Sequence, residues 1–402
     1  MKSEPKKKPV VLLAFSGGLD TTYCAIYLAE EKGLEVHTAI VNTGGFSADE
    51  LKKIEKHAYA LGVKKHYILD ETDAYYKECI RFLIYGNVLR GGVYPLSVSA
   101  ERVFQSKAIA LQAEKIKADF IAHGSTGAGN DQVRFDVIFN ILIPEIKVLT
   151  PIREMKLSRE AEISYLKEHG VKMNFEKALY SINKGLWGTS VGGKETLTSN
   201  NPLPESAFPT QLSKNKEEEM EIGFEKGEII SVNGKKFSSS VAAIQKVQEL
   251  ASPFAIGRDI HIGDTIIGIK GRVGFEASAP LIILKAHATL EKHVLTKWQL
   301  HWKEQMGNWY GMMLHEGQFL DPVMRNVETF LESTQKTVTG TVKILLAPYR
   351  FNIQGITSKY DLMSSKFGKY GEVNNAWSGE DVKGFSKIIS NQTMIYHRVN
   401  EE

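Results

Sequence analysis

Cysteine is scarce in this chain, and long apolar runs are missing. Its 402 residues include two cysteines, Cys24 and Cys79, which excludes a disulfide-built scaffold and a zinc site made of cysteines alone. No apolar run approaches the roughly 20 residues needed to cross a bilayer. Neither charge dominates, because 50 Lys and Arg against 47 Asp and Glu leave a net charge of +3. This balance gives no electrostatic footprint for nucleic acid or an anionic membrane, although it is compatible with a local basic groove.

The first residues only faintly imitate a secretory signal. Three lysines, Lys6, Lys7 and Lys8, precede a short apolar run at 10–15, and Pro9 interrupts the approach to it. The apolar region of a signal peptide is longer than this. A frayed basic tail in front of a buried first strand explains the pattern better. We therefore expect a cytoplasmic protein that binds neither nucleic acid nor a membrane.

Short apolar runs alternate with helical patterns over the first part of the chain. The expected strands are 10–15, 34–41, 66–69, 119–123 and 146–149, and the expected helices are 20–32, 47–61, 74–85, 100–117 and 158–169. Continuous apolar strands that alternate with helices are typical of an α/β fold with a parallel sheet covered on both faces. Ligands of such sheets bind at the carboxyl ends of the strands. The loops after Phe15, Val41 and His123 are therefore the first candidates for a site.

The texture of the sequence changes after this part. Residues 196–211 are rich in Asn, Pro, Ser and Thr and read as an irregular segment. Beyond it we expect strands near 225–232, 266–269, 281–284 and 342–346, helices near 241–250 and 289–310, and a last helix or arm at 381–388. These elements predict an α+β domain. We expect a nucleotide-binding domain at 1–175, a synthetase or substrate domain at 176–365 and a C-terminal arm at 366–402.

One glycine-rich loop directly follows the first apolar strand and opens a helix. It reads Ser16-Gly17-Gly18-Leu19-Asp20-Thr21-Thr22. Two glycines allow a tight turn and close approach of the backbone, and the helix amides then favour an anion such as phosphate. Asp20 is suited to a magnesium ion that bridges phosphates. The competing interpretation is an ordinary strand–helix turn in which Ser16 or Asp20 caps the helix.

A second polar loop follows the strand expected at 119–123. It reads His123-Gly124-Ser125-Thr126-Gly127-Ala128-Gly129-Asn130-Asp131-Gln132-Val133-Arg134-Phe135. Glycines beside a dense set of polar side chains at a strand's carboxyl end indicate a binding loop. Any single member has a plainer explanation, since Asn130 or Asp131 would also cap the next helix. We assign no histidine to a metal, because none shows ligand spacing.

Both loops carry a resemblance to a known family. The stretch from Ala14 to Thr22 is similar to the pyrophosphate loop of N-type ATP pyrophosphatases in the form used by argininosuccinate synthases, and the stretch from His123 to Phe135 resembles that family's signature almost intact. The resemblance implies a ligase that condenses citrulline with aspartate through a citrullyl-adenylate, in arginine biosynthesis. It implies conversion of ATP to AMP and pyrophosphate, a need for Mg²⁺, and a homotetramer joined through the C-terminal arm.

The resemblance also implies roles for individual residues. Asp20, Asp131 and Arg134 would be catalytic, with Asp20 also holding the metal. ATP would be bound by Ala14, Phe15, Ser16, Gly17, Gly18, Leu19, Asp20, Thr21, Thr22, Val41 and Gly124. Aspartate would be bound by Thr126, Asn130 and Asp131. Citrulline would be bound by Tyr94, Ser99, Asn130, Arg134, Ser181 and Ser190.

The chain departs from the family pattern at several positions. Phe15 replaces a usual Tyr, and Ala128 replaces a usual Lys. Gly263 and Phe275 stand where the family has a citrulline-binding Glu and Tyr, so an N-acylated citrulline is an alternative to the free amino acid. Two further alternatives are another adenylating ATP pyrophosphatase and a nucleotide-binding regulatory protein that has lost catalysis.

Overall fold

A computed structural model describes residues 8–127, 129–173, 180–365, 367 and 376–401 of the chain. Its N-terminal part contains a five-stranded sheet with the order β3-β2-β1-β4-β5. The strands are β1 (Val10–Ala14), β2 (Glu35–Asn42), β3 (Lys65–Asp70), β4 (Phe120–Ala122) and β5 (Lys147–Leu149). Every pairing between them is parallel. The expected doubly covered parallel α/β sheet is therefore confirmed.

Helices cover both faces of this sheet because successive side chains of β1 point to opposite sides. Val11 and Leu13 pack in one core with α1 (Leu19–Glu30), α2 (Ala48–Ala60) and α8 (Arg159–Glu168). Val10 and Leu12 pack in the other with α5 (Ser97–Ile116) and α6 (Asp131–Leu142). The remaining helical segments here are α3 (Thr72–Tyr75), a π-helical turn (Tyr76–Ile80), α4 (Arg81–Tyr85) and α7 (Pro151–Met155). Both β1 and β4 thus deliver their following loops to the same edge of the sheet.

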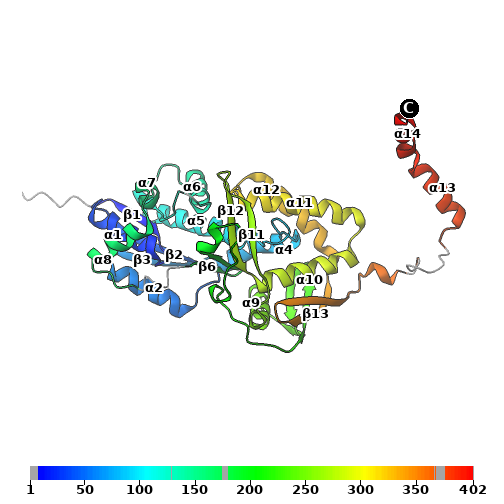
Figure 1. Cartoon of the computed structure of the whole chain (residues 1–402), viewed down its shortest axis with the longest axis horizontal. Helices are drawn as coiled ribbons and strands as arrows, with labels where there is room; N and C mark the ends of the chain where they lie inside the picture. Colours follow the sequence, from blue (N-terminus) through cyan, green and yellow to red (C-terminus); the bar gives the residue numbers. More distant parts are fainter. Residues whose placement is uncertain (1–7, 128, 174–179, 366, 368–375, 402) are drawn as a thin grey trace, which may run out of the picture.

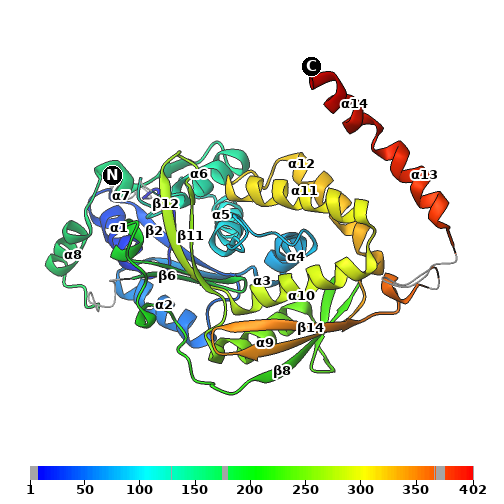
Figure 2. The ribbon, with the colours of Figure 1, turned by 45° about the vertical axis from the view of Figure 1, so that its right-hand side comes forward.

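The second half builds two antiparallel sheets (Figure 2). One has the order β11-β12-β7-β6 and the other the order β10-β9-β8-β13-β14. Their strands are β6 (Ser181–Gly185), β7 (Gly188–Gly192), β8 (Glu218–Glu225), β9 (Glu228–Val232), β10 (Lys235–Lys236), β11 (Arg258–Asp264), β12 (Lys270–Glu276), β13 (Gly340–Ala347) and β14 (Arg350–Thr357). The helices are α9 (Ser240–Ala251), α10 (Ser278–Val294), α11 (Lys297–His315) and α12 (Pro322–Ser333). The expected α+β character is confirmed.

Three local expectations in this half are wrong. Residues 266–269 form the turn of the β11–β12 hairpin, and residues 281–284 lie inside α10. The helix expected at 289–310 is two helices, because α10 ends at Val294 and the side chain of Thr296 caps α11. An apolar run that is buried on every side, as Ile282–Leu284 is, loses the helical period that would identify it.

The largest apolar core joins the two halves of the chain. Tyr75, Leu83 and Phe104 from the first half pack in the same cluster as residues of α9–α12, β8 and β13. Beyond β14, α13 (Gly379–Ile389) and α14 (Asn391–Asn400) extend away from the body (Figure 1). No helix among the described residues is long and apolar enough to cross a membrane.

Candidate active site

The loop between β1 and α1 uses one backbone amide internally, since the Gly18 N–H donates to the Ser16 hydroxyl at 3.4 Å. Gly17 adopts a positive φ of 75°, a conformation that favours glycine. Gly18 is the N-cap of α1, and no side chain hydrogen-bonds to the amides of the first turn. The Thr21 hydroxyl donates to the Gly18 carbonyl at 3.3 Å. The loop therefore offers free N–H groups and the positive end of a helix dipole to an anion.

A cavity of about 810 Å³ opens over this loop. Nine of the eleven residues expected to bind ATP line it, namely Ala14, Phe15, Ser16, Gly18, Leu19, Asp20, Thr21, Val41 and Gly124. Gly17 and Thr22 do not. Gly17 faces Ile54 of α2, and the buried Thr22 hydroxyl hydrogen-bonds with Nε2 of His57 at 3.0 Å. These two residues therefore contact α2 on the side of the loop away from the cavity.

Asp20 has an acidic neighbour that the sequence analysis missed. Glu162 of α8 is 3% exposed, and its Oε2 has no hydrogen-bond partner among the described residues. Burial, with the Asp20 carboxylate beside it, raises the pKa of Glu162 to about 8. The raised pKa favours the protonated form of Glu162, and Asp20 is the member of the pair that lines the cavity.

The second loop passes very close to the first. A Cβ on Gly124 would lie 3.2 Å from the carbonyl carbon of Asp20, so a side chain here would push the two loops apart. His123 precedes it, and its Nε2 lies 3.0 Å from Oδ1 of Asp136. Thr126 lines the larger cavity. Ala128, one of the departures from the family pattern, lies outside the described residues.

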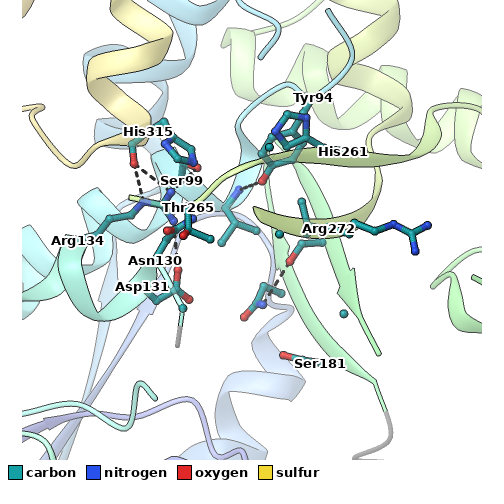
Figure 3. Close-up of a pocket in the computed structure, with 18 of the residues that line it drawn as sticks. Tyr94, Ser99, Asn130, Asp131, Arg134, Ser181, His261, Thr265, Arg272 and His315 are labelled. Atoms are coloured by element: carbon teal, nitrogen blue, oxygen red, sulfur yellow. Dashed lines mark hydrogen bonds and ion pairs between the residues drawn. The ribbon is translucent and has the colours of Figure 1, made fainter. Parts of the chain in front are cut away.

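A smaller cavity of about 270 Å³ adjoins the larger one. All six residues expected to bind citrulline line it, namely Tyr94, Ser99, Asn130, Arg134, Ser181 and Ser190. Figure 3 shows Arg134 and His315 beside Ser99, and Tyr94 beside His261. Four residues line both cavities, namely Gly129, Asp131, Ser181 and Asn183. A molecule in the smaller cavity is thus within reach of one bound over the phosphate loop.

The start of α5 delivers Ser99 to the smaller cavity. Leu96, which directly precedes the helix, is fully buried and has a positive φ of 61°. Such a conformation is rare for a bulky residue and is often found near functional sites. Three residues later, the Ser99 hydroxyl accepts a hydrogen bond from Nη2 of Arg134 at 2.9 Å. Nε of Arg134 donates to the carbonyl of His315 at 3.1 Å, so the guanidinium is fixed from two sides.

Asp131 lies at the junction of the two cavities between two arginines. Its carboxylate accepts hydrogen bonds from Nε of Arg102 at 2.8 Å and from Nη1 of Arg134 at 3.3 Å. Burial opposes ionisation of Asp131, but the two guanidiniums outweigh it and hold its pKa below the ordinary value. The carboxylate stays negative and has oxygens to offer a positively charged ligand.

Asn130 has one side-chain group in use and one free for a ligand. Its Oδ1 accepts a hydrogen bond from the backbone N–H of Ile266 at 2.8 Å, which ties the second loop to the β11–β12 turn. The amide nitrogen of Asn130 has no hydrogen-bond partner among the described residues. It is therefore available as a donor to a carboxylate.

Several residues of the site are not among those predicted from the sequence. Arg102 also donates to Oδ1 of Asn183, whose amide donates to the Ser190 hydroxyl at 3.3 Å. Arg102 follows Ser99 by one helical turn, and this spacing is a signal that could have identified it. His261 and His315 also line the smaller cavity. They come from β11 and from the end of α11, so no local pattern connects them.

The two altered positions differ in what they contact. Gly263 lines the smaller cavity. Phe275 is fully buried, and its ring lies 5.3 Å from that of Tyr94, measured between centroids. Phe275 therefore packs against the Tyr94 ring and does not itself line the cavity.

Comparisons with known proteins agree with this geometry. Residues 10–172 match the family model described as the arginosuccinate synthase N-terminal HUP domain, and residues 180–396 match that of the arginosuccinate synthase C-terminal domain. The chain is 36% identical to an argininosuccinate synthase of Methanocaldococcus jannaschii over 96% of this chain and 98% of the relative. It is 34% identical to one of Xanthomonas campestris over 97% of this chain and 98% of the relative.

Proposed function

Because the chain belongs to the argininosuccinate synthase family, we propose that its two adjoining cavities carry out the two half-reactions of that ligase. ATP binds over the phosphate loop, and citrulline binds in the smaller cavity. The observation that carries this assignment is the set of residues that both cavities share, Gly129, Asp131, Ser181 and Asn183. At that junction a ureido oxygen in the smaller cavity can approach the α-phosphate of ATP.

In the first half-reaction the ureido oxygen of citrulline attacks the α-phosphorus of ATP, and pyrophosphate leaves. The free amides of the loop at 16–21 lie where the departing pyrophosphate needs donors. Preorganised donors of this kind stabilise developing charge without reorganisation, and removing one such donor typically costs about 100-fold or more in rate. Arg134, fixed by Ser99 and by the carbonyl of His315, holds the α-carboxylate of citrulline.

In the second half-reaction the amine of aspartate attacks the adenylated carbon, and AMP leaves. Asp131 pairs with the aspartate ammonium, while Thr126 and the free amide of Asn130 donate to its carboxylates. Arg102 acts as a positioning residue, because it holds Asp131 at the junction.

Asp20 is the residue suited to hold Mg²⁺. Magnesium in nucleotide sites is bound through one or two carboxylates together with the substrate phosphates. The Asp20 carboxyl group at the cavity wall fits this pattern, and the described residues contain no cluster of three or more His, Cys, Asp and Glu that would suggest another metal site. When bound with ATP, the ion neutralises charge on the phosphate oxygens.

We also propose that the chain has two domains, at 1–175 and 176–365, followed by a C-terminal arm at 366–402. We further propose that it is a cytoplasmic protein and that four copies assemble into a homotetramer. The support for assembly is the arm itself, whose described helices expose apolar side chains. Exposed apolar patches of this extent mark interaction surfaces.

One assay tests the proposed reaction. AMP and pyrophosphate are measured with ATP, citrulline and aspartate together and then with each acceptor omitted. We expect AMP release only when both acceptors are present, and citrulline-driven exchange of pyrophosphate into ATP when aspartate is absent. ATP binding without AMP formation from any acceptor would instead indicate a nucleotide-binding protein that has lost catalysis.

A further inference from the structure

One end of the smaller cavity has more basic than acidic side chains. His261 and His315 line it, and each is less than a tenth exposed. The half-buried Arg90 does not line the cavity, but its charge acts on both histidines, and its Nη2 makes one long hydrogen bond, 3.4 Å, to the carbonyl of Asp264. Among the described residues, no carboxylate lies within ion-pair distance of Arg90, and the ring nitrogens of His261 have no hydrogen-bond partner. These groups are therefore available to an anion.

Most acids near this end are already paired. The exception is Asp259, whose charge acts on His261, but it is exposed and does not line the cavity. Of the described residues that line the smaller cavity, only Asp131 and Asp264 are acidic. Asp131 lies at the junction with the larger cavity, is held by Arg102 and Arg134, and is assigned above to the ammonium of aspartate. Asp264 is exposed and pairs with Lys270 at 2.6 Å. Glu316, outside the lining, lies 3.1 Å from Nδ1 of His315. No carboxylate is left at this end to receive the ammonium group of a free amino acid, and a buried ammonium without a partner is costly.

Glycines make room at the same end. Gly263 and Gly271, which lie opposite each other in the β11–β12 hairpin, line the cavity without side chains. A Cβ on Gly263 would lie 2.7 Å from Nε2 of His261. The His261 ring stacks on Tyr94, with 5.3 Å between the ring centroids. Gly263 therefore allows His261 to keep this position at the cavity wall.

Repulsion among the basic groups supports the same conclusion. Burial, with the positive charges of Arg134, Arg90 and His261, lowers the pKa of His315 to about 3. Burial and Arg90 also lower the pKa of His261. A carboxylate bound among these groups would reverse the effect and favour the charged imidazoles.

We propose that the acceptor is a citrulline whose α-nitrogen is acylated by a dicarboxylic acid, and that Arg90, His261 and His315 receive the distal carboxylate. Acylation replaces an ammonium by a neutral amide, and the added carboxylate supplies the anion that this end lacks. Arg134 keeps the α-carboxylate, and the ureido group still reaches the junction. The bonds formed and broken are those of the ligase reaction, and the acyl amide is unchanged. This inference rests on the proposed function, because it names the substrate of the same site.

Substrate competition tests the proposal. We compare kcat/KM for L-citrulline, N-acetyl-L-citrulline and N-succinyl-L-citrulline with saturating ATP and aspartate, and identify the product by mass spectrometry. We expect the N-succinyl form to exceed both others by about tenfold or more. A preference for free citrulline, or equal use of the acetyl and succinyl forms, would overturn the inference while leaving the ligase assignment intact. No AMP from any of the three acceptors would overturn the proposed function itself.

Two variants separate the distal carboxylate from the rest of the acceptor. Arg90→Gln should lower kcat/KM for the N-succinyl form by about tenfold or more and that for the N-acetyl form much less, because only the former has a carboxylate for Arg90. Lys343→Gln removes the same charge from an exposed position on β13, where the side chain lines neither cavity. It should leave the ratio of the two substrates unchanged. A ratio unaffected by Arg90→Gln would overturn the role of Arg90.

Discussion

Arg102 on α5 donates a hydrogen bond from Nε to Oδ2 of Asp131, the first residue of α6, at 2.8 Å. This ion pair joins the helix that carries Ser99 to the helix that carries Arg134. It lies where the two cavities meet, so the pair connects the proposed citrulline site with the proposed aspartate site.

The charge of Asp131 should matter most in the second half-reaction. We expect Asp131→Asn to lower argininosuccinate formation by about 100-fold or more, because the aspartate ammonium loses its partner. Citrulline-driven exchange of pyrophosphate into ATP should fall much less. Because two guanidiniums also lose a charged partner, stability should fall by about 1–3 kcal/mol, measured by urea unfolding. An equal loss of exchange and product formation would contradict this division of roles.

Arg102 should set the pH at which Asp131 works. The Arg102 and Arg134 guanidiniums hold the pKa of Asp131 below its ordinary value. Removing one of them in Arg102→Met should raise that pKa, so the acidic limb of the pH–rate profile for the aspartate-dependent step should move to higher pH. Arg102→Lys keeps the charge and is the matched control. Identical limbs in the Met and Lys variants would show that Arg102 does not act through Asp131.

The loss of Asp20 should separate catalysis from folding. Asp20→Asn should lower AMP formation by about 100-fold or more, since the phosphates and their metal lose a charged ligand. Asp20 makes no cap hydrogen bond, so folding loses its interaction with the helix dipole, about 0.3–1 kcal/mol, and its electrostatic effect on Glu162. The measurements are AMP release at saturating Mg²⁺ and thermal unfolding. Near-normal AMP release would show that this loop has another role.

The parallel sheet and the phosphate loop were predictable because their signals are local. Val10–Ala14 is a continuous apolar strand, and the glycines that shape the next turn follow at once. The turn at 266–269 was mistaken for a strand because its isoleucines suggest burial, yet Ile267 and Ile269 are exposed. Glu162, His261 and His315 were missed because each reaches the site through tertiary packing, and nothing near them in the sequence indicates their neighbours.

Glu162 should make stability depend on pH around neutrality. Burial and the Asp20 carboxylate raise its pKa from 4.5 to about 8. The folded state then binds more protons than the unfolded state between these values, so this group's contribution to stability falls as the pH rises from about 5 to 8. Glu162→Gln should remove that dependence and be more stable than the parent at pH 8, measured by urea unfolding across the range. Parallel pH profiles for the two proteins would refute the raised pKa.

The C-terminal arm should determine the assembly state. Its apolar side chains are exposed, among them Phe385 at 65% and Ile388 at 72%. They lie three residues apart on α13 and therefore on one face of the helix. Burial of this face against another copy would stabilise the assembly by roughly 1.5–3 kcal/mol for each large side chain.

Phe385→Ser combined with Ile388→Ser should therefore reduce the mass in solution, measured by light scattering after size-exclusion chromatography. The matched control is Lys383→Ser combined with Lys387→Ser, which changes charged residues of the same helix and should preserve the mass. Circular dichroism should show that the body of both variants is folded, because α13 contributes no residue to the cores of the sheets. An unchanged mass for the Phe385 and Ile388 variant would show that the chain does not assemble through this face.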